Sequence, residues 1–263
     1  LPTQTLPPAT HTNCYVLGVS GGERIIVDPA AKSKDALDIL RNKVREIEST
    51  GSEIIATIFT HKHPDHIGDL ENISKIYQAP IWTSKETFKM IPKCESDRIL
   101  KEGDDFKLTG KGESVSWSII ETHGHCPGHI CLVGDAGIIS GDNVTVIGTI
   151  LVPSSDGDMN QYLEGLERIK NLNPPLLFPG HGPFSANPQR LLNRYITHRN
   201  ERHMLVYNAV KNNNKELESI AKKSYEDTPD AHPALLIDQT LSHLKGHIKS
   251  ENIREEGGRY YIN

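Results

Sequence analysis

Short apolar stretches alternate with amphipathic stretches along the first two thirds of the chain. The apolar stretches are typical of strands, because each is only a few residues long and is bounded by turn residues. They lie at residues 13–19, 24–27, 53–60, 114–121, 130–133, 138–140 and 176–178. Apolar residues recur at helical spacing from Leu37 to Ile47 behind a capping Ser33, and further helices are predicted over 70–78 and around 163–172. This alternation predicts a layered α/β protein with two sheets and flanking helices.

The pattern changes after Pro188 and becomes mostly helical. Helical periodicity extends over 190–211, 216–224 and 234–248, and a last strand is predicted over 259–262. Three helices followed by a β-wing is the order of a winged-helix module. We therefore predict a catalytic domain at residues 1–187 and a helical, winged-helix-like C-terminal domain at residues 188–263.

Composition and charge narrow the class of protein. The chain has 263 residues, of which 36% are hydrophobic, so it can bury a sizeable core. A net charge of −5 argues mildly against tight binding to duplex nucleic acid. No apolar run is long enough to cross a bilayer and no leader is visible, so we expect a cytoplasmic protein without a membrane partner. The chain begins at Leu1 rather than Met, which leaves open a processed leader before it.

The cysteines do not form a recognisable framework. Cys14, Cys94, Cys126 and Cys131 include no CxxC pair and no regular spacing. This argues against a disulfide scaffold and against a cysteine-type zinc knuckle, so we expect unpaired thiols.

Side chains that bind metals gather where predicted strands end. The strand at 53–60 is followed by a His-x-His-x-Asp-His cluster, and three later ligand-type residues each lie in a glycine-flanked turn. The seven residues are His61, His63, Asp65, His66, His125, Asp142 and His181. Imidazole nitrogens and carboxylate oxygens are good ligands for zinc and related divalent ions. Seven ligands are enough for two ions.

The spacing within the cluster indicates how two ions would share these ligands. Alternate side chains can point to different sides, so the first two histidines can hold one ion while the last two residues reach a second. The two later histidines can complete the two sites, and Asp142 can bridge them because a carboxylate has two oxygens. Two bridged ions would lower the pKa of a shared water to near 7 and so generate a hydroxide nucleophile. We expect zinc, with iron or manganese as alternatives.

Two simpler explanations of these residues are weaker. The chain has 13 histidines, and a lone one such as His203 is best explained as a surface or core residue. Four ligand-type residues within six positions at a strand end are too specific for that explanation. A structural zinc site is usually closed and rich in cysteine, whereas this set has no cysteine and includes carboxylates. Open coordination and catalysis are favoured.

At these residues the chain resembles the metallo-β-lactamase superfamily. The resemblance spans about residues 10–185 and follows five motifs in order. They are Asp28 at a strand end, His61-x-His63-x-Asp65-His66, His125 within Thr122-His123-Gly124-His125-Cys126-Pro127-Gly128-His129, Gly141-Asp142, and Pro179-Gly180-His181-Gly182. The resemblance implies an αββα sandwich with the metals at one edge, between the two sheets.

The resemblance also assigns the ligands. It implies that His61, His63 and His125 bind one metal and that Asp65, His66 and His181 bind the other, with Asp142 as the bridge. Asp28 would steady the ligand loop without binding metal. Cys126 departs from the family pattern, which usually has threonine or another small polar residue there. It either touches the metal pocket or is a buried thiol, and we expect the buried thiol.

Within the superfamily, the chain is similar to the β-lactamase-like protein 2 group. The similarity rests on the uninterrupted first domain and on Arg199 in the segment 197–200, which opens the helical tail. Some members of this group are single-strand RNA endonucleases, and fungal relatives are thioesterases that act on carrier-protein-bound acyl chains. The basic glutathione-binding tail of the glyoxalase II group is not recognisable here. True β-lactamases usually lack Asp65.

Several functions follow from the motifs. We favour a metal-dependent hydrolase of a small ester, thioester or lactone, in which Asp65 orients the nucleophile. The alternatives are a single-strand-specific endoribonuclease, β-lactam hydrolysis as a minor activity, and a binding or assembly module with a vestigial metal site. The tail is only slightly basic and has few aromatic residues for base stacking, which favours the small substrate over RNA. The tail can also shape an acyl pocket or pair two subunits into a homodimer.

Overall fold

The computed structural model describes residues 1–93, 95 and 97–263, so the predicted thiol of Cys94 lies outside the described residues. The chain forms two compact units. The first unit comprises residues 1–122, 128–150 and 173–188, and the second comprises residues 123–127, 151–172 and 189–263. The domain boundary at residue 188 stays a prediction.

The first unit contains two five-stranded sheets. The first sheet has the order β1(Tyr15–Gly18), β2(Glu23–Val27), β3(Glu53–Ile58), β4(Ile81–Thr83) and β5(Arg98–Ile99). The hairpin β1–β2 is antiparallel and the remaining pairs are parallel. The parallel strands therefore direct their carboxyl ends to one edge, where ligands usually bind in such sheets.

The second sheet is mostly antiparallel. Its order is β10(Leu177–Pro179), β9(Gly137–Gly141), β8(Ile130–Gly134), β7(Glu113–Glu121) and β6(Asp105–Gly110). Only the β9–β10 pair is parallel. Because β9 and β10 run in the same direction, the loops that follow them leave the sheet at the same edge.

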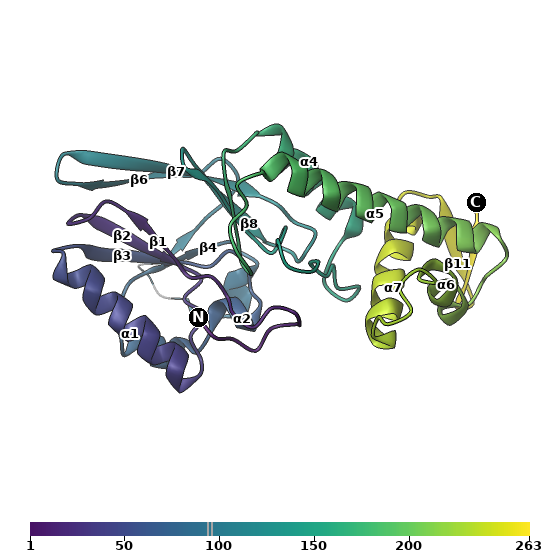
Figure 1. The fold of residues 1–263 in the computed structure, drawn as a ribbon, viewed down its shortest axis with the longest axis horizontal. Coiled ribbons are helices and arrows are strands. Elements are labelled where there is room, and N and C mark those ends of the chain that lie inside the picture. Colours follow the sequence, from purple (N-terminus) through teal and green to yellow (C-terminus); the bar gives the residue numbers. More distant parts are fainter. Residues whose placement is uncertain (94, 96) are drawn as a thin grey trace. The chain divides into compact units, whose positions relative to one another are not determined.

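The two sheets pack face to face. Their shared core joins Val27 and Ile58 of the first sheet to Leu108, Ile119 and Leu132 of the second. The outer face of the first sheet is covered by helices (Figure 1), and a second core there joins Leu40 and Val44 to Ile26 of β2. The helical elements of this unit are α1(Lys34–Ser49), α2(Pro64–Ile67), α3(Leu70–Ser74) and the 3-10 turn η1(Thr87–Lys89).

The second unit is mainly helical. Its elements are α4(Met159–Asn171), α5(Pro188–Lys211), α6(Leu217–Ser224), α7(Pro233–Lys249), β11(Ile253–Glu256) and β12(Arg259–Ile262). Val206, Ile220 and Leu244 share a core with Ile253 and Tyr260, so α5, α6 and α7 pack together with the small β11–β12 sheet. The three helices and the last strand follow the predicted order, β11 was not predicted, and the assignment as a winged-helix module stays a prediction.

The predicted α/β sandwich with a helical C-terminal region is confirmed. Ser33 caps α1 by accepting a hydrogen bond from the backbone N–H of Ala36. The helix predicted over 70–78 ends at Ser74, because the backbone N–H of Ile76 bonds to the carbonyl of Ile73, three residues back, in a tighter turn. The strands β4, β5 and β6 were not predicted. Among the described residues, the structure contains no helix with the length and apolar character needed to span a bilayer.

Candidate metal centre

Six of the seven predicted metal ligands lie in the first unit, each in a loop or short helix that follows a strand. His61 and His63 follow β3, Asp65 and His66 belong to α2, Asp142 follows β9, and His181 follows β10. The helix α2 begins directly after His63 with Pro64, whose fixed φ favours the first helical position. Because the chain turns sharply after β3, the ligand side chains of residues 61–66 all come from one short segment.

Five of these six residues, all but His63, form two overlapping groups of ligand atoms. One group is His61, His66 and Asp142, and the other is Asp65, His66 and His181. In each group the ligand atoms all lie within 4.8 Å of one another. Asp142 Oδ1 is 3.3 Å from His66 Nε2 and 3.4 Å from His181 Nε2. Because Asp142 also shares a group with His61, it approaches ligands that were predicted to belong to different ions.

Asp28 orients two of the histidines. This buried carboxylate accepts hydrogen bonds at Oδ1 from the backbone N–H of Thr60 (2.8 Å) and at Oδ2 from the Thr60 hydroxyl (2.7 Å). His66 Nδ1 donates to the same Oδ2 at 2.9 Å. Because the Thr60 hydroxyl donates its only proton to Asp28, it accepts from His61 Nδ1 at 3.0 Å. In His61 and His66 the Nδ1 atom is therefore occupied, and Nε2 is the nitrogen presented to the centre.

In His181, as in His61 and His66, Nδ1 has a hydrogen-bond partner and Nε2 faces the centre. Its Nδ1 donates to the backbone carbonyl of His11 at 2.8 Å, and its Nε2 lies 3.5 Å from Asp65 Oδ2. The acceptor is 170 residues away in the sequence, at the end of the N-terminal segment. An acceptor on Nδ1 selects the tautomer in which Nε2 can bind a metal.

The electrostatic field of the centre favours cations. Burial lowers the pKa of His66, but the carboxylates of Asp142 and Asp28 outweigh burial and raise that pKa well above its ordinary value. Burial also lowers the pKa of His181, yet hydrogen bonds to Asp142 and Asp65 raise it to about 10. For Asp65, burial raises the pKa, but the hydrogen bond from His181 brings it down to about 2. The carboxylates thus hold positive charge on the histidines, and a bound divalent cation would take the place of these protons.

The residues present fit two divalent ions. His66 Nε2 is buried and makes no hydrogen bond within the part of the chain that the structure describes. A Cβ at Gly180 would lie 2.5 Å from Asp142 Oδ1 and 2.6 Å from His66 Cε1, so glycine is needed where the backbone passes these ligands. The donor set combines imidazole and carboxylate, as divalent transition metals prefer.

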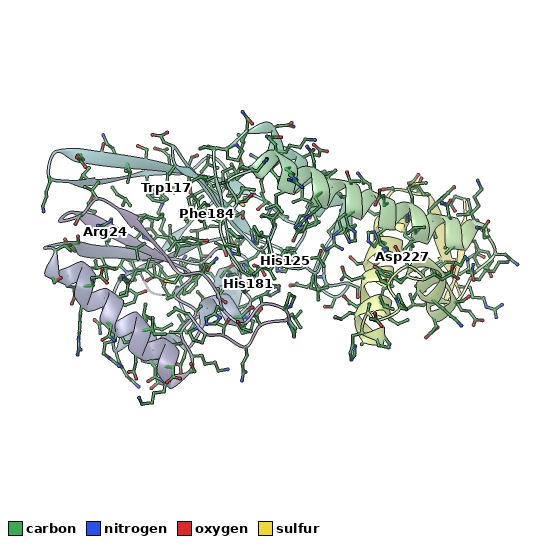
Figure 2. All side chains as sticks on the ribbon, in the orientation of Figure 1. Arg24, Trp117, His125, His181, Phe184 and Asp227 are labelled. Carbon is green, nitrogen blue, oxygen red and sulfur yellow. The ribbon has the colours of Figure 1, made fainter. Side chains whose placement is uncertain are left out.

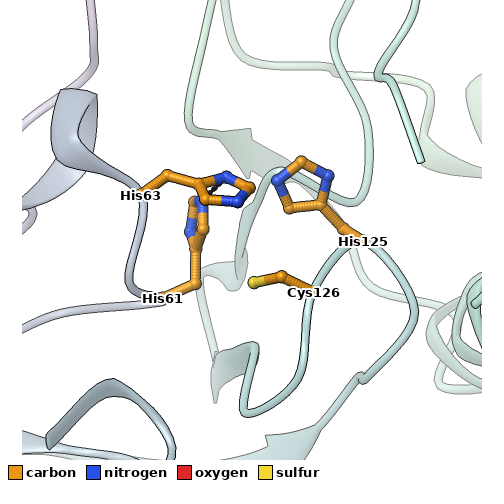
Figure 3. A group of neighbouring side chains, drawn as sticks. All are labelled: His61, His63, His125 and Cys126. Carbon is orange, nitrogen blue, oxygen red and sulfur yellow. Dashed lines mark hydrogen bonds between the residues drawn. The ribbon is translucent and has the colours of Figure 1, made fainter. Parts of the chain in front are cut away.

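The remaining predicted ligand, His125, lies in the segment 123–127 of the second unit. Its Nδ1 donates to the carbonyl of Leu151 at 2.8 Å. Its neighbour Cys126 is also a metal-ligand type (Figure 3 labels both). Burial holds the pKa of His61 well below its ordinary value, so the ring is neutral as a metal ligand must be. Cys126 is fully buried, as expected for this thiol.

One residue of the centre, His129, was not assigned a role from the sequence. Its Nε2 accepts a hydrogen bond from the backbone N–H of Asp142 at 3.1 Å, and its Nδ1 donates to the Thr122 hydroxyl at 2.9 Å. Asn143 Nδ2 donates to the same hydroxyl at 3.0 Å. His129 therefore positions the loop that carries Asp142. The only signal in the sequence was its place at the end of the 122–129 motif.

The family described as the metallo-beta-lactamase superfamily matches residues 7–181. The chain is 26% identical to a beta-lactamase-like protein 2 homolog of Drosophila melanogaster over 265 residues, which cover 95% of this chain and 88% of the relative. It is also 26% identical to an atrochrysone carboxyl ACP thioesterase of Aspergillus fumigatus, over 80% of this chain and 62% of the relative.

The fold is similar to that of a solved beta-lactamase domain protein from Burkholderia ambifaria. The two structures superpose with a TM-score of 0.79 and 21% sequence identity, over 100% of this chain and 90% of the other. At this identity the likeness concerns the fold alone.

Proposed function

The chain belongs to the metallo-β-lactamase superfamily of metal-dependent hydrolases, and we propose that it uses two divalent ions to hydrolyse a small ester, thioester or lactone. The observation that carries this proposal is the position of Asp142. Its ligand atoms group with His61, a member of the first proposed ligand set, and approach His66 and His181, members of the second. A carboxylate in this position suits a bridge between two ions.

In this proposal each ligand keeps the role expected from the family. His61, His63 and His125 would hold one ion, Asp65, His66 and His181 the other, and Asp142 would contact both. When bound, the ions would supply a hydroxide nucleophile at neutral pH and stabilise negative charge on the substrate carbonyl. Zinc is the proposed metal, with iron or manganese as alternatives.

The chain's own residues would orient the reactants. Asp65 has a pKa of about 2 and is therefore ionised at neutral pH, so it can accept a hydrogen bond from the nucleophile and orient it. Asp28 and His129 would act only through the ligands, by fixing His66 and the Asp142 loop. Hydrolysis adds one water across the acyl C–O or C–S bond and releases an acid together with an alcohol or a thiol.

The cationic side chains of the second unit support a small substrate over RNA. Arg199 and Arg202 are only 2% and 4% exposed, and Arg199 Nη1 donates to Gln239 Oε1 at 3.2 Å. Arg202 donates to both carboxylate oxygens of Asp227 at 2.9 and 3.1 Å (Figure 2 labels Asp227). Lys245 Nζ donates to a backbone carbonyl at 2.8 Å, and Lys249 Nζ pairs with a carboxylate at 2.7 Å. All four cations thus have partners inside the unit.

The thioesterase name of the Aspergillus fumigatus relative also supports an acyl substrate for this chain. Within the proposal, RNA cleavage and β-lactam hydrolysis are alternative outcomes of the same experiment. A cytoplasmic location and a homodimer stay predictions.

The decisive experiment measures metal content and turnover on one metal-loaded sample. Plasma mass spectrometry should find about two ions per chain, and the sample should hydrolyse a thioester or a lactone in preference to a β-lactam or a labelled single-stranded RNA. Asp142→Ala should lower both metal content and turnover, the latter by about 100-fold or more, because it removes the bridging carboxylate. Asp135→Ala, which changes an exposed carboxylate in the β8–β9 turn, is the matched control and should behave as wild type.

The outcomes separate the alternatives. RNA cleavage without carbonyl turnover would identify an endoribonuclease. Full turnover by Asp142→Ala would rule out the two-ion arrangement, and a chain that binds no metal would overturn the proposal altogether.

A further inference from the structure

A cavity of about 380 Å³ lies beside Asp65 in the first unit. Its walls come from the N-terminal segment, the segment between β2 and α1, and the start of α2. The lining residues are Pro2, Thr3, Gln4, Ala30, Lys32, Ser33, Pro64 and Asp65. The volume suits a small molecule, since ligand pockets usually measure about 300–1,000 Å³.

The N-terminal wall of this cavity is held in place by hydrogen bonds at both of its ends. Pro2 and His11 form a β-bridge, and the hydroxyls of Thr3 and Thr12 lie 2.9 Å apart. The carbonyl of His11 accepts the hydrogen bond from His181 Nδ1 at 2.8 Å. The N-terminal segment of residues 1–12 therefore lines the cavity through residues 2–4 and, through the carbonyl of His11, also orients one of the proposed metal ligands.

The charges of the lining point to the kind of substrate. Only two of the lining residues carry charge, Asp65 and Lys32. Asp65 belongs to the proposed ligand set. Lys32 is exposed, and among the described residues it has no hydrogen-bond or ion-pair partner. Its neighbour Lys34 differs, because Lys34 Nζ pairs with Asp38 at 2.8 Å and does not line the cavity. The cavity thus offers one ammonium group that has no hydrogen-bond or ion-pair partner among residues 1–93, 95 and 97–263.

We propose that this cavity binds the acyl part of the substrate and that Lys32 pairs with a carboxylate on that acyl group. The preferred substrates are then esters or thioesters of dicarboxylic acids rather than of neutral fatty acids. Thr3, Gln4 and Ser33 supply further hydrogen-bonding groups, while Pro2, Ala30 and Pro64 contact the methylene carbons. This inference rests on the proposed hydrolase function and narrows its substrate class.

The test compares two thioesters of equal acyl length on the metal-loaded protein. S-succinyl-N-acetylcysteamine carries the terminal carboxylate, and S-pentanoyl-N-acetylcysteamine replaces it with an uncharged end. Wild type should have the higher kcat/KM for the succinyl compound. Lys32→Met should lower that value by about tenfold or more, the usual scale for a hydrogen bond to a charged group, and should change the pentanoyl value by less than about twofold.

Control variants separate charge from shape. Lys32→Arg should retain most of the preference, because it keeps the cation, and Lys34→Met should match wild type. A phosphopantetheine thioester with a neutral acyl group carries its negative charge on the phosphate of the leaving group. It tests whether Lys32 binds that phosphate in place of an acyl carboxylate. If Lys32→Met impairs that substrate and spares the succinyl compound, Lys32 binds the leaving group and the acyl assignment is wrong.

A binding measurement separates this inference from the proposed function. Calorimetric titration with the non-hydrolysable amide analogues of both thioesters should show tighter binding of the succinyl analogue to wild type, and loss of this difference in Lys32→Met. Turnover of both thioesters without a preference would overturn the role of Lys32 and leave the hydrolase intact. Preferential binding of the succinyl analogue without turnover of any acyl substrate would support the site and count against the hydrolase.

Discussion

Each of the two units contains a group of three histidines that are buried or, for His203, half-buried, and the two groups differ in the charges around them. The groups are His61, His66 and His181 in the first unit, and His203, His243 and His247 in the second. In the first unit carboxylates raise the pKa of two of the three rings. In the second unit all three pKa values are lowered, chiefly by burial.

In the second group the histidine rings pack against one another, and their pKa values are lowered. The His203 and His247 rings are stacked with centroids 3.5 Å apart, and His203 Nδ1 lies 3.0 Å from His243 Nδ1. The charged groups that act on His243 include the guanidinium groups of Arg199 and Arg202, which disfavour a further positive charge. Clustered histidines alone therefore indicate packing, and nearby carboxylates are what turn such a cluster into a cation site.

The largest expected effect comes from removing a carboxylate that supports the first group without binding metal. Asp28→Asn places an amide N–H where His66 Nδ1 and the Thr60 hydroxyl now donate, so His66 loses its fixed orientation. Metal affinity should fall by about 10- to 100-fold, as measured by competition with a chromophoric chelator.

Asp69→Asn provides the matched control for this change. Asp69 also accepts a hydrogen bond at a helix start, that of α3, but is not among the grouped metal-ligand side chains. Its metal affinity should equal that of wild type. If the metal affinity of Asp28→Asn differs from that of wild type by less than twofold, the carboxylate of Asp28 is not needed to orient the ligands.

The second group is expected to affect stability in mild acid, and to leave metal affinity unchanged. The pKa of His203 falls from 6.5 to about 4 in the folded chain, mainly by burial and then by His247. Between these values the unfolded chain binds a proton that the folded chain does not, so the free energy of unfolding falls as pH drops from 6.5 to about 4. His203 alone should contribute a loss on the order of 2–3 kcal/mol.

Urea unfolding followed by circular dichroism at several pH values between 7 and 4.5 measures this loss. His203→Gln should reduce the dependence of stability on pH, whatever it does to stability at pH 7. His11→Gln, which replaces an exposed histidine of the first unit, should leave the pH dependence unchanged. An unaltered slope in His203→Gln would mean that other groups cause the acid sensitivity.

The smallest effect is expected where a cation of the second unit is exposed. Lys249→Met removes the contact with Asp158 at 2.7 Å, but Lys249 is 57% exposed and exposed ion pairs contribute little. Thioester turnover and affinity for labelled single-stranded RNA should both stay within error of wild type. A marked loss of RNA affinity would show that this unit binds nucleic acid despite its internal partners.

Much of the metal centre could be predicted from local sequence. The residue types and the spacing in His61-x-His63-x-Asp65-His66 carry the ligand chemistry, and a strand followed by a tight turn is enough to bring such side chains together. The main helices were predictable for the same reason, because apolar periodicity is a property of neighbouring residues. The strand β5, with two residues, is too short to leave such a pattern.

The sequence by itself determined which side chains could bind metal, since coordination depends on atom type and on short-range geometry. Only the tertiary structure decided which partner each ring nitrogen has. Asp28 reaches His66 across 38 positions and the His11 carbonyl reaches His181 across 170, and such pairs depend on how strands and loops pack. Packing likewise buried Arg199 and Arg202, because long side chains on an amphipathic helix can extend either to solvent or into a core.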